Sequence, residues 1–312
     1  MTPVALSLRC ALVLACFSAP SLLAHDSPEH VVELLSARIR ERGKTAELLW
    51  QRATEQRALN HLAAAAADLR EAISLQPAFI VAQADLGRVE FQLGDTPRAL
   101  QTLTRAISDA GAAAPGLLHL ARAEIRNAAG DFKGALADVE KAVEAGLPPD
   151  PDWYLLRSQI QLRLGRSLEA AAGLKEGLDR TGCAVLEADW IDALLDSRQA
   201  EPALTRIEAQ LAETRCRSSW LIRRARARLL LGKATQARGD LHAAISEING
   251  RLSPAHPDVS LLVDRGVAHA LLGDLPTAQR ELDAVRKAGG ERQSTWRLEA
   301  LLGSSKPGGP VP

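Results

Sequence analysis

Aromatic residues are scarce in this chain of 312 residues. They make up 3% of it, whereas hydrophobic residues of all kinds make up 46%. The core must therefore consist mainly of Ala and Leu, which suits close helix–helix packing. Sustained alternation of apolar and polar residues is also lacking, and β-branched runs are few, so the sequence argues against a fold built from strands.

The chain also lacks net charge and recognisable catalytic motifs. Its 38 Lys and Arg residues equal its 38 Asp and Glu residues, so nothing attracts the whole chain to nucleic acid or to an anionic membrane. HExxH, GxSxG and a Gly-rich phosphate loop are absent, and the seven His residues are scattered without metal-ligand spacing. We expect no enzyme activity, no metal and no cofactor, and an uncharacterised enzyme is the least favoured alternative.

The first 24 residues resemble an export signal. Arg9 precedes an apolar run at 10–17, and the small residue Ala24 precedes the first further charge-bearing segment. We predict a signal peptide at 1–24 and a periplasmic or secreted mature chain. The apolar run is far shorter than the roughly 20 residues that span a bilayer, so we predict no transmembrane segment. The alternative is a lipoprotein, because "VLAC" at 13–16 resembles a lipobox in which Cys16 is acylated.

Cysteines are few, and either form of processing leaves one pair of thiols. The four are Cys10, Cys16, Cys183 and Cys216, of which the last two belong to the mature chain. They lie 33 residues apart. An even count in an oxidising compartment predicts a disulfide between Cys183 and Cys216.

The chain does contain one segment that recurs along its length. "FQLGDTPRALQTLTRAI" at 91–107 returns as "NAAGDFKGALADVEKAV" at 127–143 and "ALLGDLPTAQRELDAVR" at 270–286. The copies recur at nearly equal intervals, and a near-fixed period of about 34 residues indicates stacked helical hairpins. Seven copies align on a turn position, and an Ala follows five residues later in every copy. The turn positions are Asn60, Gly94, Gly130, Gly165, Arg198, Gly232 and Gly273, and the alanines are Ala65, Ala99, Ala135, Ala170, Ala203, Ala237 and Ala278.

The spacing resembles the tetratricopeptide repeat, a unit of 34 residues with small or apolar residues at fixed points. Unit 80–113 carries the resemblance best, with Leu86 and Gly87 in the first helix, Gly94 in the turn, and Ala99 and Leu103 in the second helix. The resemblance predicts an all-α, right-handed solenoid of about seven helix-turn-helix repeats. The units are 46–79, 80–113, 116–149, 151–183, 184–217, 218–258 and 259–290.

The flanking segments fit such a solenoid. Residues 27–43 predict a leading helix with Ser27 as N-cap, and 291–303 predict a capping helix with Leu298, Leu301 and Leu302 on its inward face. Trp296 falls on the opposite side of that helix, and the sequence does not indicate what its ring packs against. Residues 304–312 are predicted to form a disordered tail.

A charge pattern recurs inside the units. Position seven of a unit is Arg in five units, and position 23 is acidic in four of those five. Sixteen residues separate the two, which joins the two helices of one hairpin. We interpret these residues as structural ion pairs. The predicted pairs are Arg52 with Asp68, Arg122 with Asp138, Arg224 with Asp240, and Arg265 with Glu281.

Proteins of the tetratricopeptide family commonly bind partners in a concave groove lined by first helices. By resemblance, unit positions five, nine and twelve are among those that face it. The Lys and Asn residues of the family's carboxylate clamp are missing there apart from Asn127. The groove candidates are Trp50, Thr54, Arg57, Arg88, Phe91, Glu124, Asn127, Gln159, Asp192 and Arg226.

The sequence thus predicts an exported bacterial scaffold that binds a protein or peptide in this groove. Trp50, Arg57, Arg88 and Phe91 offer aromatic and cationic groups together, a mixture that favours an acidic and apolar partner segment. The main alternative is a lipid-anchored assembly factor of the cell envelope.

Overall fold

The structure is a computed structural model that describes residues 27–253, 257–290 and 292–304. These residues form helices and connecting turns without any strand, and the predicted all-α repeat architecture is confirmed. The predicted signal peptide, Cys10, Cys16 and tail residues 305–312 lie outside the described residues.

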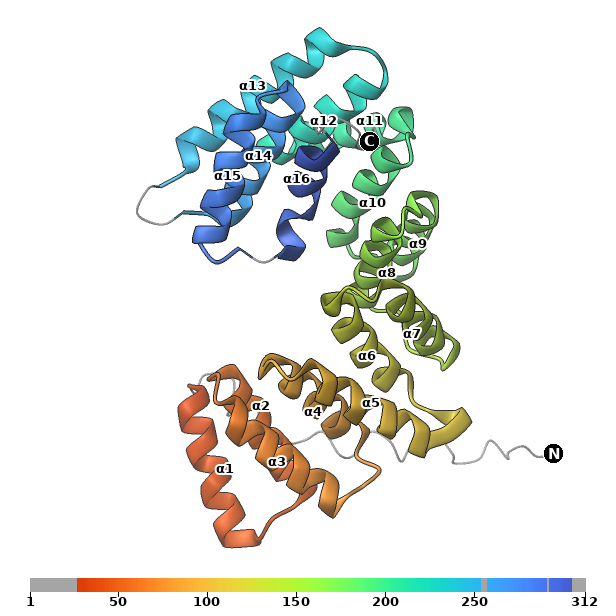
Figure 1. The fold of residues 1–312 in the computed structure, drawn as a ribbon, viewed down its shortest axis with the longest axis vertical. Coiled ribbons are helices and arrows are strands. Elements are labelled where there is room, and N and C mark those ends of the chain that lie inside the picture. Colours follow the sequence, from red (N-terminus) through yellow and green to blue (C-terminus); the bar gives the residue numbers. More distant parts are fainter. Residues whose placement is uncertain (1–26, 254–256, 291, 305–312) are drawn as a thin grey trace, which may run out of the picture. The chain divides into compact units, whose positions relative to one another are not determined.

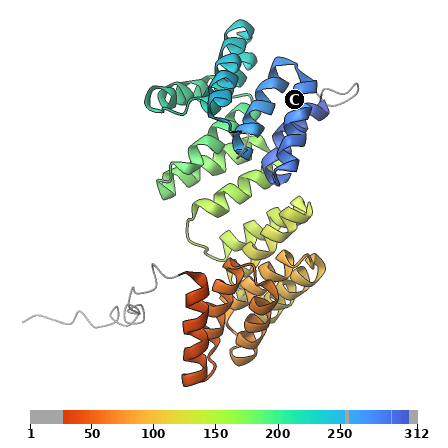
Figure 2. The same ribbon diagram turned by 90° about the vertical axis from the view of Figure 1, so that its left-hand side faces the viewer.

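The chain divides into two compact units, residues 1–147 and 148–312 (Figures 1 and 2). The segment that begins the second unit is rich in proline, with Pro148, Pro149 and Pro151. Unit 1 contains α1 (Pro28–Arg42), α2 (Ala46–Ala58), α3 (Leu62–Leu75), α4 (Ile80–Gln92), α5 (Thr96–Ala110), a 3-10 turn (Gly111–Ala113), α6 (Gly116–Ala129) and α7 (Phe132–Glu144). Unit 2 contains α8 (Pro151–Arg163), α9 (Ser167–Thr181), α10 (Val185–Asp196), α11 (Ala200–Glu213), α12 (Ser218–Leu230), α13 (Ala234–Arg251), α14 (Val259–Leu272), α15 (Leu275–Lys287) and α16 (Arg292–Ser304).

The turn inside each repeat ends one helix and begins the next. All seven aligned turn positions have positive φ, including the two that are not glycine, Asn60 at 58° and Arg198 at 61°. A residue in this left-handed region closes the first helix, and glycine adopts it at least cost. An Asp follows the glycine in three turns and caps the second helix, as Asp95 does by accepting from the backbone N–H of Arg98 at 3.1 Å.

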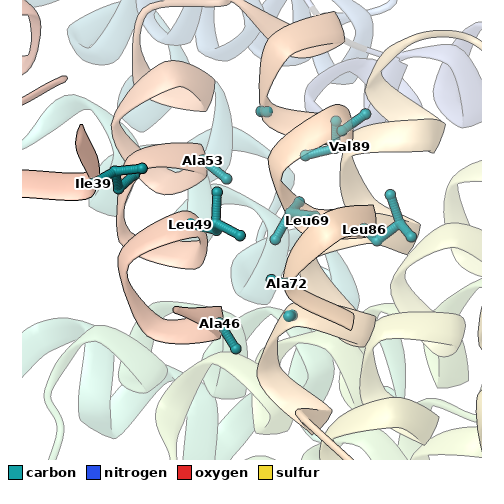
Figure 3. Close-up of a cluster of buried hydrophobic side chains, with 11 residues drawn as sticks. Ile39, Ala46, Leu49, Ala53, Leu69, Ala72, Leu86 and Val89 are labelled. Atoms are coloured by element: carbon teal, nitrogen blue, oxygen red, sulfur yellow. The ribbon is translucent and has the colours of Figure 1, made fainter. Parts of the chain in front are cut away.

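The repeated alanines lie where the helices of each pair approach one another. All seven have no exposed surface. A larger side chain at these positions would push the two helices apart. In the first repeats they join a core of small and aliphatic side chains, in which Leu49 and Ala53 of α2 face Leu69 and Ala72 of α3 (Figure 3). The scarcity of aromatic residues is therefore explained by helix pairs that leave little space between them.

The first and last helices cover the ends of the two units. On α1, Val31, Leu35 and Ile39 are buried, and Ser27 caps the helix as predicted by accepting from the backbone N–H of His30. On α16, Leu298 is fully buried and packs where Gly266 of α14 leaves space. None of the helices in the described ranges combines the length and the apolarity that a membrane span requires.

The predicted disulfide is not formed, because Cys183 and Cys216 are both free. Cys183 lies in the short connection between α9 and α10, and Cys216 lies between α11 and α12. Equivalent points on neighbouring helix pairs are separated by about 8–10 Å, whereas a disulfide needs Cα atoms within about 7 Å. One repeat of separation therefore places the two thiols on equivalent corners without bringing them within bonding distance.

Candidate functional site

The structure brings together all four predicted Arg–acid pairs. Arg122 donates from Nε and Nη2 to the two carboxylate oxygens of Asp138 at 2.9 and 2.7 Å, and Arg52 reaches Asp68 in the same two-pronged way. Arg224 binds Asp240 in the same way, whereas Arg265 donates one hydrogen bond to Glu281, from Nη2 at 3.0 Å, with its Nε 2.9 Å from the other carboxylate oxygen. The hydrogen bonds to Asp68 and Asp240 hold the pKa of Arg52 and Arg224 above the usual value.

The same arginines also contact the helix that precedes them. Arg52 donates to Ser36 of α1 at 3.1 Å, and Arg122 donates to Thr104 of α5 at 3.0 Å. Arg265 donates to Asn249 of α13 at 2.7 Å. Each of these guanidinium groups therefore joins three consecutive helices, which assigns it a structural role.

Repeats without the pattern use other pairs. In unit 80–113, the buried carboxylate of Glu90 accepts from Thr102 at 2.6 Å and from Arg70 at 3.0 Å. In unit 184–217, Glu187 accepts from Arg206 and from Gln210. Arg157, which the sequence left without an acid at position 23, faces Gly173 and reaches Glu176 at 3.3 Å.

The first helices of unit 1 carry a connected row of side chains, here called the unit 1 row: Trp50 and Arg57 of α2, Asp85 and Arg88 of α4, and Glu124 of α6. The indole Nε1–H of Trp50 donates to Asp85 at 2.8 Å, and Arg57 lies 3.5 Å from the same carboxylate. Arg88 donates to both oxygens of Glu124 at 2.7 and 2.9 Å and to Asp85 at 3.3 Å. Burial opposes the charge of Arg88, but Glu124 and Asp85 outweigh it and raise the pKa.

The two cations that were predicted to bind an acidic partner are thus already neutralised by carboxylates of the chain itself. Arg57 and Arg88 face Asp85 and Glu124, so the unit 1 row has no net charge. The other candidates in this unit are Thr54 and Asn127, which are exposed and half-buried, and Phe91, which packs against the core of α4–α6. Gln159 of α8, in unit 2, is exposed.

A second charged row lies on the first helices of unit 2. The unit 2 row consists of Asp189, Asp192 and Asp196 of α10, Arg223 and Arg226 of α12, and Asp264 of α14. Arg226 donates to both Asp192 and Asp196, and Arg223 donates to Asp192 at 2.9 Å. The sequence placed Arg226 on the inner face as a binding candidate, and here its guanidinium is occupied by two carboxylates of the neighbouring repeat.

Burial and crowding shift the pKa values of the unit 2 row. Burial would raise the pKa of Asp192, but Arg223, Arg297 and Arg226 outweigh it and hold the pKa far below the usual value. Burial raises the pKa of Asp264 to about 6. Burial, followed by repulsion from Asp192, also raises the pKa of Asp189. The row therefore contains two carboxylates whose negative charge is poorly compensated.

The capping helix α16 reaches this row. Arg297 donates from Nη2 to Asp196 at 3.1 Å, and its Nη1 lies 3.0 Å from Asp192, across about one hundred residues of sequence. The guanidinium groups of Arg297 and of Arg163 on α8 lie over the ring of Trp296, 4.9 and 5.1 Å from its centroid. Trp296, which the sequence did not place, thus points away from the Leu298 face and toward the first helices of unit 2.

No family model and no curated protein matches the sequence. Solved structures do resemble the fold. A tetratricopeptide repeat protein from Parabacteroides merdae superposes with a TM-score of 0.59 over 82% of this chain and 98% of its own, at 18% identity. YrrB, described as a TPR protein with an unusual peptide-binding site, gives 0.50 over 57% of this chain and 91% of its own, at 14% identity. The Cut9–Hcn1 structure gives 0.50 over 88% of this chain and 52% of its own, at 12% identity.

The chain has the tetratricopeptide repeat fold. In this repeat, unit position six carries a charge in four of seven units: Asp85, Asp189, Arg223 and Asp264. None of these four was among the groove candidates, which lie at positions five, nine and twelve, although the recurrence of charge at position six could have revealed them. The contacts of Arg297 had no such signal, since nothing in the pattern of α16 pairs it with α10.

Within the tetratricopeptide repeats that the structure describes, no three His, Cys, Asp or Glu side chains are grouped so that they could hold a metal ion. The charged groups of both rows contact one another in pairs and networks rather than converging on an open centre. What these surfaces offer chemically is ordered hydrogen-bonding groups next to aromatic and aliphatic side chains, which is suited to binding.

Proposed function

We propose that this chain is a non-catalytic scaffold that binds a protein or peptide segment on the inner side of its first helices. The observation that carries the proposal is the unit 1 row, in which hydrogen bonds connect three consecutive first helices from Trp50 to Glu124. Side chains held in this way lose little conformational entropy when a partner binds, so more of the contact energy appears as affinity. The description of YrrB as a peptide-binding TPR protein supports the same use of the fold.

The partner of unit 1 is expected to be mixed in character rather than strongly acidic. Asp85 and Glu124 already neutralise Arg57 and Arg88, so an acidic segment gains little from these cations. Trp50, in the row, and Phe91, on the same helix as Arg88, are half-buried and supply apolar surface. Aromatic and Arg side chains dominate binding hot spots because they combine large contact area with directed hydrogen bonds.

The test adds bulk on the inner side without breaking the charge network. Thr54 is exposed and lies near Arg57 and Asp85, and Asn127 lies on α6. Thr54→Trp combined with Asn127→Trp is expected to reduce the captured partners at least tenfold in affinity purification followed by mass spectrometry. Gln101→Trp, at an exposed position of the second helix α5, is the matched control and should capture the wild-type set. An identical set of partners for all three proteins would overturn the proposed surface.

We further propose that the chain is exported, with cleavage after Ala24. The layout of Arg9, the apolar run and Ala24 supports this. Intact-mass measurement of the mature protein should give a chain that starts at His25. A diacylated Cys16 at the N-terminus would instead establish the lipid-anchored alternative.

A further inference from the structure

The unit 2 row has more negative than positive groups. Four carboxylates, Asp189, Asp192, Asp196 and Asp264, face Arg223, Arg226 and Arg297. Asp189 and Asp264 accept no hydrogen bond from any residue that the structure describes. Without Arg297, only Arg223 and Arg226 would remain against the four carboxylates, because Arg251, which also acts on Asp264, is paired with Glu247. Because positive charge is in deficit on this surface, a ligand that binds there is expected to be cationic.

The acidic residues alone would not define a binding site, but a ligand-like group already lies on them. The guanidinium of Arg297 arrives from a helix that packs on α14 and α15, not on α10 (Figure 1). Its contact with Asp196 spans 101 residues of sequence. An arginine side chain from outside the row is therefore bound at Asp192 and Asp196 in the chain itself.

Arg297 is also an imperfect occupant. Its buried Nη1 lies 3.0 Å from Asp192, yet it makes no hydrogen bond of acceptable geometry. Leu298, the neighbouring residue, anchors α16 on α14 by filling the space beside Gly266, so α16 has a buried contact that does not involve Arg297. A change of side-chain rotamer can therefore release Arg297 while α16 stays in place.

The surroundings suit an arginine that is followed or preceded by an apolar residue. Leu229 and Leu230 lie three and four residues after Arg226, so they project from the same side of α12. Both leave large apolar surface exposed, at 38% and 41%. Guanidinium binds paired carboxylates in a fixed two-pronged geometry that an ammonium group does not reproduce.

We propose that the inner side of unit 2 binds an arginine-bearing peptide segment at Asp192 and Asp196, and that Arg297 occupies this subsite until such a segment displaces it. The inference rests on the proposed scaffold function and specifies the partner's chemistry for one surface. A tethered competitor acts at an effective concentration of about millimolar, so removing it should strengthen binding of an external arginine.

The test is selection of a phage-displayed library of random dodecapeptides on the full chain and on Arg297→Ala. Arg297→Ala should enrich peptides with an arginine beside an apolar residue. Synthetic copies of these peptides should bind this variant at least tenfold more tightly than the wild type. Replacing the peptide's arginine with lysine, or adding Asp196→Asn to the variant, should weaken binding at least tenfold. Arg297→Lys should lie between the wild type and Arg297→Ala.

Two controls separate the possible failures. Arg286→Ala removes a contact between α15 and Glu299 of α16 on another side of the helix, so it should bind like the wild type. Equal affinity for the wild type and Arg297→Ala, or selected peptides without arginine, would overturn the subsite. If the selected peptides lack arginine but lose binding to the variant that carries Thr54→Trp and Asn127→Trp, the scaffold function stands while this inference fails. If no protein enriches any peptide, both fail.

Discussion

At the scale of single residues, the most unusual group is Asp264 on α14. Its carboxylate is largely buried, and the groups that act on it are Arg223 of α12, Asp192 of α10, Arg251 of α13 and Asp258 at the start of α14. Burial dominates and raises the pKa to about 6, against an ordinary value near 3.8. Because the folded pKa lies above the unfolded one, the folded chain binds more protons between about pH 4 and pH 6. Stability therefore falls as the pH rises through this window.

Asp264→Asn should remove that loss of stability. Each pKa unit corresponds to about 1.4 kcal/mol, so the variant should be about 2–3 kcal/mol more stable than the wild type at pH 8 and nearly equal to it at pH 4. Urea unfolding followed by circular dichroism at both pH values measures the difference. Asp283→Asn, at an exposed position of α15, controls for the loss of a charge. A gain of the same size at pH 4 and pH 8 would show that ionisation of Asp264 is not its cause.

At the scale of the element, two glycines separate backbone strain from steric fit. An added Cβ meets no atom within 4 Å at either Gly94 or Gly239, but Gly94 has φ +85° in a turn whereas Gly239 lies inside helix α13. Gly94→Ala should cost about 1 kcal/mol, because an L-residue is strained in the left-handed region. Gly239→Ala should stabilise by about 0.5–1 kcal/mol, because alanine is the better helix former. Thermal unfolding measures both, and changes of the same sign would contradict this account.

The ion pairs inside the hairpins also belong to this scale. Asp138 is 2% exposed and accepts from Arg122 and from Arg126, so removal of one partner leaves a buried charge poorly compensated. A double-mutant cycle with Arg122→Met and Asp138→Asn should give a coupling energy of about 2 kcal/mol. The exposed Lys175–Asp179 pair of α9 should give about 0.5 kcal/mol or less. Equal coupling in the two cycles would mean that burial adds nothing to the hairpin pair.

At the scale of the whole molecule, the period of the sequence was enough to predict the repeats. The aligned turn positions all have positive φ, even Asn60 and Arg198, because the geometry of the turn constrains the backbone whichever residue is present. The seven alanines are all buried for an equally local reason, which is the distance between the helices of one pair. Features that depend on residues within one repeat were thus readable from the sequence.

Features that depend on neighbouring repeats were not readable. Asp85 and Glu124 neutralise Arg57 and Arg88 across repeats, and the distance of Arg297 from Asp196 along the chain gives no hint of their contact. The expected disulfide is likewise absent, since Cys183 and Cys216 occupy equivalent connections of neighbouring repeats and are both free. The candidate site is built mainly from such contacts, so Arg88, Glu124 and Asp192 were predicted as members of the site, whereas Asp85, Arg297 and the pairing of all these residues were not.

The charge contacts of this chain are of two kinds, and they affect rearrangement of the repeats differently. Arg122 and Asp138 belong to one repeat, so copying or deleting that repeat carries the pair along intact. Arg70 with Glu90 and Arg88 with Glu124 each join two repeats, so exchanging a neighbour leaves one charge without its partner. The first kind lets the array change in length. The second kind restricts which repeats can stand next to each other, and thereby preserves the order of side chains along the first helices.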